Sequence, residues 1–455
     1  MSQQPGKYLV TTFGCQMSFH DSQVIAGLLE DIGYESTQNL EEADIVIFNT
    51  CCVREKPERK VLSRLDEMKH IKEKKPNLIV GVSGCMVQQG AQLENIKKNY
   101  SQVDLVFGTH NIHRLPELLH RVIATGQQII EVWDRGDEGE VVEDLPVRRE
   151  DGLKAWVNII YGCDNFCAYC IVPYVRGRER SRLMEKVIEE VAELGREGYK
   201  EVTLLGQNVN SYGKDLGEGV NFGTLLTRLN EIPGIERIRY MTSHPRDFSY
   251  ELINTIASLD KVCEHIHLPL QAGSDRVLKM MNRGYTSSYY SDLVSRIRER
   301  IPGSSITTDL MIGFPGETDD DFKATLRMVK EIRFDAAYTF VFSPRKGTKA
   351  AHMLEQVPEE VKRERIIELV KVQNNITREI NEELKGKTFQ VLVEGVSKND
   401  DNMLSGRTRT NKIIVFPGDK DKLLGSFVNV KVIETGPWTS KGVLDLEKEQ
   451  RDVSK

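Results

Sequence analysis

The first 135 residues alternate between short runs of apolar, often β-branched residues and longer stretches in which apolar residues recur every three or four positions. The short runs lie at 7–13, 44–48, 77–82 and 103–107. A helical spacing follows the first of them over about 22–31. Because strands that alternate with helices form parallel sheets, this part is predicted to be a parallel α/β domain.

An acidic segment without apolar periodicity, 136–151, is predicted to be a linker, and the alternation resumes behind it. Strands are predicted at 154–160, 201–205, 236–241, 263–268, 304–312 and 336–342. Helices are predicted between them at about 183–197, 222–231, 248–259, 286–299 and 318–332. Six consecutive strand–helix units predict a partial (βα)6, TIM-like barrel, which binds its ligands at the carboxyl ends of its strands.

The spacing of apolar residues changes in the last part of the chain. A long charged helix is predicted over 358–384, and behind it apolar residues alternate with polar ones over 388–396, 413–416 and 427–432. Period two between turn residues predicts a small all-β domain of the five-stranded barrel type. The predicted division of the chain is 1–135, 136–151, 152–384 and 385–450.

Composition and charge narrow the class of protein. The 455 residues are 39% hydrophobic and 29% charged, which excludes wholesale disorder. Lys and Arg number 62 against 68 Asp and Glu, so a globally basic nucleic-acid binder is excluded and any such contact must come from local patches. No run approaches the roughly 18 apolar residues of a membrane span, and no signal-peptide pattern opens the chain. We therefore expect a cytoplasmic protein with no membrane partner.

Three of the eight cysteines, Cys163, Cys167 and Cys170, fall within eight residues directly after a predicted strand. A loop this short can hold three corners of a cubane iron–sulfur cluster, because thiolates are soft ligands that suit iron or zinc. A structural zinc site needs four protein ligands, and no fourth Cys or His stands near the triplet. The alternatives are a zinc knuckle completed from a distant part of the chain and a set of ordinary buried cysteines.

Cys15, Cys51 and Cys85 each directly follow a predicted parallel strand. Parallel strands of one sheet end at the same edge, so these thiols can converge there. We expect a second three-cysteine cluster, and the alternative is that each is an ordinary buried cysteine. Cys51 is preferred over its neighbour Cys52 because it holds the same strand-end position as the other two. Cys263 lies in an apolar strand and is expected in the core.

The pattern Cys-x-x-x-Cys-x-aromatic-Cys over 163–170 resembles the signature of the radical S-adenosylmethionine (SAM) superfamily, and the resemblance covers 154–342. In that superfamily one open iron of a [4Fe–4S] cluster binds SAM, which is cleaved to a 5′-deoxyadenosyl radical. The resemblance places Tyr169 against the adenine of SAM.

Both cysteine sets together resemble the methylthiotransferase family, which joins an N-terminal three-cysteine domain, a radical SAM barrel and a C-terminal TRAM domain. The resemblance covers essentially the full chain and implies two [4Fe–4S] clusters, one on each cysteine set. The stretches Gly14-Cys15-Gln16-Met17 and Asn49-Thr50-Cys51 look like the branch that acts on tRNA, whereas the ribosomal-protein branch typically has Gly-Cys-Pro-Lys at the first cysteine. Ser18 and Cys52 depart from the pattern of the tRNA branch, but neither departure removes a ligand.

The tRNA branch acts on an anticodon stem-loop that carries N6-isopentenyladenosine next to the anticodon. The resemblance implies that the hydrogen on carbon 2 of this base is replaced by a methylthio group. That bond is too inert for a protein base, so the cofactors carry the chemistry while the protein orients them. The resemblance further implies two SAM molecules per turnover and an electron from a flavodoxin- or ferredoxin-type donor, and it leaves the sulfur donor unknown.

Polar residues stand where the predicted barrel strands end, and the family places its SAM contacts on these stretches. The expected cofactor-binding residues are Tyr169, Gln207, Asn208, Ser243, Gln271, Asp309 and Gly313. The alternative for each residue is ordinary turn chemistry at a strand end.

Two local basic groups are candidates for RNA contact. Arg176 and Arg178 lie directly beyond the triplet, and Arg407 and Arg409 lie in the last domain. Arg binds phosphates bidentately, and small β-barrels with exposed basic residues are common RNA platforms. The alternative for the first group is a solvated or salt-bridged loop.

Two other functions stay open on the sequence alone. One is methylthiolation of another acceptor, either a ribosomal protein side chain or another modified tRNA adenosine. The other is an iron–sulfur or zinc protein that binds RNA without catalysis. The large barrel with polar strand ends favours the enzyme, because an electron carrier or binding module would not need it.

Overall fold

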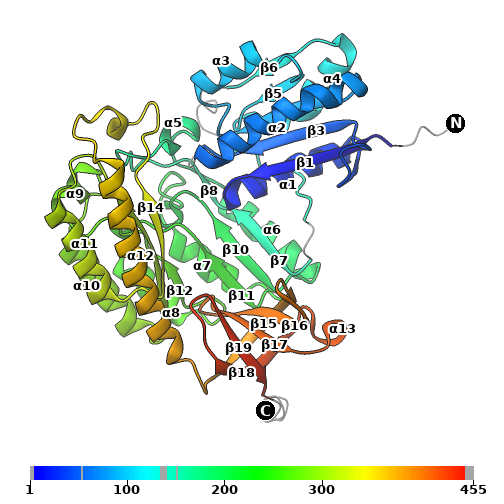
Figure 1. Ribbon diagram of the computed structural model, residues 1–455. Coiled ribbons are helices and arrows are strands. Elements are labelled where there is room, and N and C mark those ends of the chain that lie inside the picture. Colours follow the sequence, from blue (N-terminus) through cyan, green and yellow to red (C-terminus); the bar gives the residue numbers. More distant parts are fainter. Residues whose placement is uncertain (1–4, 53–54, 134–140, 150–151, 446–455) are drawn as a thin grey trace.

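Three parts follow one another along the chain of the computed structural model, which describes residues 5–52, 55–133, 141–149 and 152–445. An N-terminal α/β part lies at one end, a strand–helix barrel lies in the middle, and a small β-barrel closes the other end (Figure 1). Short 3₁₀ helices connect several elements, namely η1 (Ile112–Arg114), η2 (Val209–Ser211), η3 (Pro245–Asp247) and η4 (Lys349–His352).

The N-terminal part is a parallel sheet with the strand order β2-β1-β3-β4-β5-β6. Its strands are β1 (Lys7–Phe13), β2 (Glu35–Ser36), β3 (Ile45–Thr50), β4 (Ile79–Gly84), β5 (Leu105–Phe107) and β6 (Ile129–Glu131). Its helices are α1 (Gln16–Asp31), α2 (Glu55–Lys74), α3 (Gly90–Asn99) and α4 (Leu115–Thr125). Alternate residues of β3 face opposite ways, so Ile45 and Ile47 pack with α1 and α4 while Val46 and Phe48 pack with α2 and α3.

The central part is an open barrel of parallel strands. Its strands are β7 (Lys154–Asn158), β10 (Glu201–Leu205), β11 (Arg237–Tyr240), β12 (His265–His267), β13 (Ser305–Ile312) and β14 (Ala336–Val341). They form two three-stranded sheets, and a parallel bridge between Ile238 and Val262 connects them. The covering helices are α6 (Met184–Arg196), α7 (Phe222–Asn230), α8 (Tyr250–Ser258), α9 (Asp275–Met280), α10 (Ser287–Arg300) and α11 (Asp319–Ile332).

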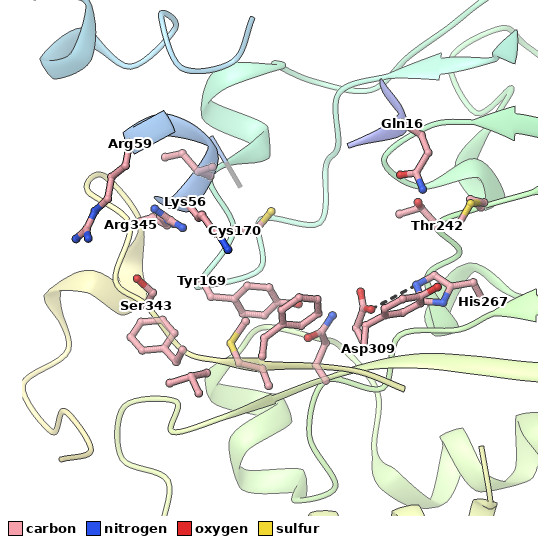
Figure 2. Close-up of a pocket in the computed structure, with 18 residues that line it drawn as sticks. Gln16, Lys56, Arg59, Tyr169, Cys170, Thr242, His267, Asp309, Ser343 and Arg345 are labelled. Carbon is pink, nitrogen blue, oxygen red and sulfur yellow. Dashed lines mark ion pairs between the residues drawn. The ribbon is translucent and has the colours of Figure 1, made fainter. Parts of the chain in front are cut away.

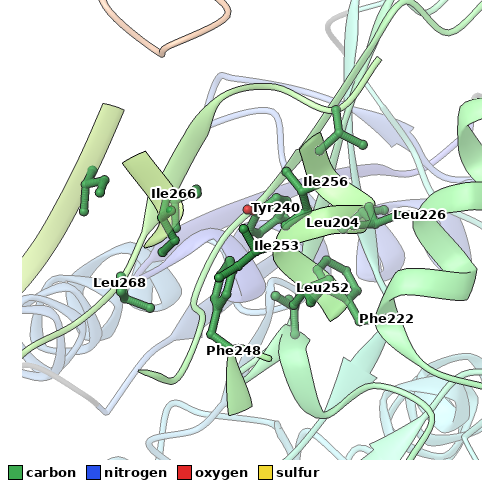
Figure 3. Close-up of a cluster of buried hydrophobic side chains, with 14 of the residues drawn as sticks. Leu204, Phe222, Leu226, Tyr240, Phe248, Leu252, Ile253, Ile256, Ile266 and Leu268 are labelled. Atoms are coloured by element: carbon green, nitrogen blue, oxygen red, sulfur yellow. The ribbon is translucent and has the colours of Figure 1, made fainter. Parts of the chain in front are cut away.

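The apolar core of the barrel lies between these strands and their helices. Figure 3 shows one region of it, where residues of α7 and α8 pack on Leu204 and Tyr240 of the strands. The rings of Phe222 and Tyr240 meet edge to face with their centroids 5.4 Å apart. The polar residues at the carboxyl ends of the strands lie outside this core, where a ligand can reach them.

The C-terminal part is a closed barrel in the order β15-β16-β17-β19-β18. The long helix α12 (Glu359–Glu382) precedes it and packs beside β14. Its elements are β15 (Thr388–Ser397), β16 (Asp400–Thr408), β17 (Ile413–Pro417), α13 (Lys420–Leu423), β18 (Phe427–Glu434) and β19 (Thr439–Leu444).

Buried arginines of β11 attach this small barrel to the central part. Arg237 donates to the backbone carbonyls of Arg407 (2.8 Å) and Gln390 (3.0 Å). Arg239 donates in the same way to Arg409 (2.8 Å) and Thr408 (2.7 Å). Two guanidinium groups therefore satisfy backbone acceptors across the domain boundary, which fixes the position of the small barrel.

The predicted fold class is confirmed in all three parts, with differences at the edges. Helix α1 begins at Gln16 rather than near Ser22, and the short strands β2 and β6 were not predicted. In the last domain, three of the five strands were predicted from runs of alternating apolar and polar residues. The other two strands of the barrel are β16 and β19. Within the described ranges, no helix combines the length and apolar character needed to cross a membrane.

Candidate active site

The cysteine triplet occupies a loop between β8 (Ile160–Tyr161) and the short helix α5 (Val172–Val175). Gly162 begins this loop with a φ of +77°, and a Cβ there would lie 1.9 Å from the backbone oxygen of Arg178. The amide of Cys170 donates to the carbonyl of Cys167 (2.9 Å), which closes a tight turn. The loop geometry therefore depends on a glycine directly before the first cysteine.

Burial makes two thiols of this loop, those of Cys163 and Cys170, poor acids on their own. Desolvation is the largest cause that raises the pKa of Cys163 to about 11 and of Cys170 to about 12. A metal centre deprotonates its thiol ligands outright, so this environment suits a bound metal more than free thiolates. In the described part of the chain, no three acidic, histidine or cysteine side chains stand close enough together to hold a single metal ion.

A buried arginine and an asparagine contact the triplet. Arg283, which is 4% exposed, donates to the Cys167 sulfur (3.4 Å) and to the Pro269 carbonyl (2.9 Å). The Asn165 amide lies 3.4 Å from the Cys163 sulfur. Hydrogen bonds to the sulfurs are a usual means by which proteins tune iron–sulfur clusters.

The N-terminal cysteines lie together at the carboxyl edge of the first sheet. Cys15 is the N-cap of α1, while Cys51 and Cys85 follow β3 and β4. A hydrogen bond with Cys51 is the main cause that lowers the pKa of Cys15 to about 5. A hydrogen bond between Cys52 and Cys85 raises the pKa of Cys52 and lowers that of Cys85. The structure therefore pairs Cys51 with Cys15 and Cys52 with Cys85.

Glycine permits this crowding of thiols. A Cβ on Gly14 would lie 2.7 Å from the Cβ of Cys51. Gly84 has a φ of +98°, and a Cβ there would lie 2.4 Å from the backbone oxygen of Thr50. A side chain at Gly14 would therefore displace Cys51 or Ser18, and one at Gly84 would be strained as well as crowded. Both glycines directly precede a cysteine.

Helix α5 and the residue before it contact the N-terminal cysteine set. Cys52 and Cys85 pack against Ile171 and Val175, which follow the triplet directly. The residues that follow the triplet thus contact thiols of the N-terminal set, although the two sets come from different domains.

Arg176 lies at this boundary and is buried, unlike an arginine that binds RNA at the surface. It is 4% exposed, donates to the Cys85 sulfur (3.1 Å) and forms a buried ion pair with Asp21 (2.5 Å). A guanidinium held in this way has its donors engaged within the protein, which leaves the predicted RNA contact of Arg176 without structural support. The sequence could not show this, because the partners lie 91 and 155 residues away.

A cavity of about 790 Å³ opens beside the triplet (Figure 2). Among the expected cofactor-binding residues, Tyr169, Gln271 and Asp309 line it, together with Cys170. Gln16, which follows the first N-terminal cysteine, lines the same cavity. One cavity therefore has residues from both cysteine domains in its wall.

Polar and strained residues line this cavity. Oδ1 of Asp309 lies 3.6 Å from Nε2 of His267. A dashed line marks this ion pair in Figure 2. Thr242 and Gln271 both line the cavity with left-handed backbone, at φ values of +70° and +71°. Such strain in residues other than glycine gathers at binding sites, and no pattern in the sequence indicates it.

Three further expected residues lie at the carboxyl ends of β10 and β11. Gln207, Asn208 and Ser243 each have a buried side-chain oxygen without a hydrogen-bond partner among the described residues. The same is true of the side-chain amide of Asn210 and of Nε2 of His244. Because buried polar atoms are normally satisfied, this group suits a polar ligand such as SAM, with its amino, carboxylate and hydroxyl groups.

Gly313 lies elsewhere. A Cβ at this position would meet the Lys362 side chain at 2.4 Å, and its φ is +71°. Its amide donates to Glu317 (3.0 Å). Gly313 therefore packs against α12, and it does not line the cavity, which leaves its expected contact with SAM without structural support.

The remaining candidate RNA residues differ in their surroundings. The Arg178 side chain is 71% exposed and pairs with Asp164 at 2.9 Å. Arg409 donates three hydrogen bonds to Glu264 of the central barrel, and Arg407 donates to Asn411 (3.0 Å) and lies 3.4 Å from Glu394. Arg178 is thus available on the surface, whereas Arg409 holds two domains together.

Three family models match the chain in succession. They are described as "Uncharacterized protein family UPF0004" over residues 7–108, "Radical SAM superfamily" over 157–329 and "TRAM domain" over 382–444. The solved structure of TsrM, a radical S-adenosylmethionine methyltransferase from Kitasatospora setae, shares the fold with a TM-score of 0.55 and 15% identity, and the match covers 76% of this chain and 77% of that one. The fold and the cysteine loop thus define a radical SAM protein.

Curated relatives show to which family of radical SAM proteins the chain belongs. The tRNA-2-methylthio-N(6)-dimethylallyladenosine synthase of Thermoanaerobacter pseudethanolicus is 56% identical over 437 residues, which cover 96% of this chain and 92% of the relative. The enzyme of the same name from Pelotomaculum thermopropionicum is 57% identical over 426 residues, with coverage of 94% and 95%. The chain belongs to the family of tRNA-2-methylthio-N(6)-dimethylallyladenosine synthases.

Proposed function

We propose that this chain replaces the carbon-2 hydrogen of N6-isopentenyladenosine, next to the anticodon of tRNA, with a methylthio group. Family membership over nearly the whole chain supports a tRNA methylthiotransferase. The observation that carries the proposal is that residues directly after the triplet pack against thiols of the N-terminal set, and that residues of both domains line one cavity. Sulfur insertion needs a sulfur source and a radical source at one place, and this arrangement supplies both positions.

Each cysteine set would hold one [4Fe–4S] cluster. Cys163, Cys167 and Cys170 are the proposed ligands of the cluster that binds SAM, and the second cluster is proposed on Cys15, Cys51 and Cys85. When bound, the first cluster with SAM would supply a carbon radical that can remove an inert hydrogen, and the open iron of the second would hold the sulfur to be inserted, whose donor is unknown. With three protein ligands, each cluster keeps one iron open, to SAM in the first cluster and to the sulfur in the second.

The other residues of the cavity would bind and orient SAM. Tyr169 presents an aromatic ring beside the triplet, while Gln271 and Asp309 offer hydrogen-bonding groups in the same wall. The unpartnered oxygens of Asn208 and Ser243 lie at neighbouring strand ends and suit the polar groups of the cofactor. Burial of these groups excludes water from the place where a radical would form.

A tRNA anticodon stem-loop that carries isopentenyladenosine is the proposed substrate. Arg178 is the proposed surface contact to its phosphates, because its guanidinium is exposed near the cysteine loop. A flavodoxin- or ferredoxin-type protein is proposed to deliver the electron, and the cytoplasm is the proposed compartment.

Complementation of a bacterial strain that lacks the modification tests this function. The native chain is expected to restore 2-methylthio-N6-isopentenyladenosine, measured by mass spectrometry of tRNA nucleosides, whereas Cys167→Ala is expected to abolish it. Cys263→Ser, which changes a buried cysteine outside both sets, is the matched control and should retain the product. A native chain that leaves isopentenyladenosine unchanged, or a methylthio group found on ribosomal protein instead, would contradict the proposal.

A further inference from the structure

A second cavity, of about 730 Å³, lies where the three parts of the chain meet. Its wall includes residues of β1 and α1 from the first part, of β7, β10 and β11 from the central barrel, and of β15 and β16 from the small barrel. Gln16, Met241 and Tyr338 line this cavity and the first one as well. The two cavities are therefore neighbours that share part of one wall.

An aromatic pair from two domains forms one side of the second cavity. Phe19 of α1 and Trp156 of β7 lie with their ring centroids 5.8 Å apart and their planes at 46°. Phe19 is 42% exposed, which is unusual for a residue in a domain contact. Exposed aromatic rings in a polar cavity are the surfaces on which proteins stack unpaired nucleobases.

The charges of the cavity favour an anion. Lys154 and Arg407 approach the same carboxylate, that of Glu394, at 3.2 Å and 3.4 Å. Arg239 is paired with Glu201 at 2.8 Å, so that pair is neutral. Lys154, Arg407 and Glu394 together therefore carry a net charge of plus one. Phosphate is the anion that accompanies a nucleobase, and it would suit this charge.

Amide groups complete the wall. Gln16, Gln23, Gln38 and Asn411 line the cavity, and the side-chain oxygen of Gln23 is buried without a hydrogen-bond partner among the described residues. Side-chain amides offer both donors and acceptors, as the edges of bases require. The cavity thus combines stacking, hydrogen-bonding and phosphate-binding groups.

We propose that this cavity binds the unpaired nucleotide adjoining the target adenosine, with its base on Phe19 and Trp156 and its phosphate at Lys154 and Arg407. The inference rests on the proposed function, because the target base must leave its stack and enter the first cavity. Its covalently attached neighbour must then lie close by, and the second cavity shares a wall with the first. Holding that neighbour would position carbon 2 of the target base.

Fluorescence of Trp156 tests this subsite directly. The chain contains three tryptophans, so Trp133→Phe with Trp438→Phe leaves Trp156 as the reporter. The probe is an anticodon stem-loop RNA with isopentenyladenosine, compared with RNAs that are abasic on the 5′ or on the 3′ side of that base. Intact RNA is expected to quench Trp156 in a saturable way. One of the abasic RNAs is expected to lose the quenching and bind about 5- to 150-fold more weakly.

A conservative variant supplies an independent test. Phe19→Leu keeps an apolar side chain but removes the aromatic face, so it is expected to weaken binding of intact RNA by a similar factor. RNA-independent cleavage of SAM and the iron content are expected to stay unchanged, since the variant lies outside the cysteine loops. Tyr250→Leu removes another exposed aromatic residue, on α8 away from both cavities, and should bind RNA as the native chain does.

The possible failures are distinguishable. Equal quenching and affinity with all three RNAs, while the intact one is still methylthiolated, would overturn the subsite and leave the proposed function standing. The subsite is likewise overturned if Phe19→Leu binds RNA as tightly as Tyr250→Leu. Absence of methylthiolation of intact RNA by the native chain would overturn the proposed function and, with it, this inference.

Discussion

Two buried arginines show how single residues differentiate the two cysteine sets. Arg176 donates to Cys85, and its charge is balanced by Asp21. Arg283 donates to Cys167, and the described residues give it carbonyl and phenol partners but no ion pair with a carboxylate. The N-terminal thiols therefore have a neutral ion pair beside them, whereas the triplet has an uncompensated positive charge.

This difference predicts an electrochemical effect of Arg283→Met. Removing a positive charge beside a thiolate destabilises the reduced cluster, so the reduction potential of the proposed SAM-binding cluster should fall by on the order of 60 mV or more. Redox titration of the anaerobically reconstituted protein, followed by electron paramagnetic resonance, measures it. Arg283→Lys keeps the charge and should recover most of the potential, and an unchanged potential in the methionine variant with its cluster intact would contradict the assignment.

Cys51 and Cys52 give a second prediction at this scale. Each contacts one of the other N-terminal thiols, but only Cys51 holds a strand-end position like those of Cys15 and Cys85. Cys51→Ala should lose about half of the reconstituted iron, while Cys52→Ala should keep it. Iron and sulfide analysis decides, and the opposite pattern would move the ligand assignment to Cys52.

At the scale of elements, sequence patterns predict the barrel strands closely because the strands alternate with helical patterns and are flanked by turn residues. They fail for the start of α1, where Ser18, His20 and Asp21 are polar yet buried. The first turn of α1 is buried at the boundary with the central domain and not in the apolar core. The sequence therefore lacks the stripe of apolar residues that would predict a helix there. The cysteine positions could be predicted from strand ends, whereas the strain at Thr242 and Gln271 arises only from tertiary packing.

Loop geometry at this scale predicts the effect of Gly162→Ala. Its positive φ and the clash with the carbonyl of Arg178 would force the cysteine loop open, so the variant should lose about half of the reconstituted iron. Gly198→Ala is the matched control, because Gly198 has a φ of +97° but open space around it. Equal iron content in both variants would show that the loop tolerates the change.

At the scale of the whole molecule, the ion pair between Asp21 and Arg176 joins two domains beside the N-terminal cysteines, where Arg176 also donates to Cys85. Asp21→Asn would leave a buried guanidinium uncompensated, so the free energy of unfolding should fall by about 3–5 kcal/mol. Urea denaturation of the metal-free protein measures this change. Asp164→Asn, at the exposed pair with Arg178, should cost less than about 1 kcal/mol, and equal losses would contradict the structural role of the buried pair.

The central claim is that one chain brings two three-cysteine clusters to a shared cavity. The most direct measurement is quantitative iron and sulfide analysis, with Mössbauer spectroscopy, of protein reconstituted without oxygen. We expect about eight irons per chain in two [4Fe–4S] clusters, falling to about four in a variant with Cys15, Cys51 and Cys85 replaced by alanine. A native chain that holds only about four irons, with the same content in that variant, would contradict the claim.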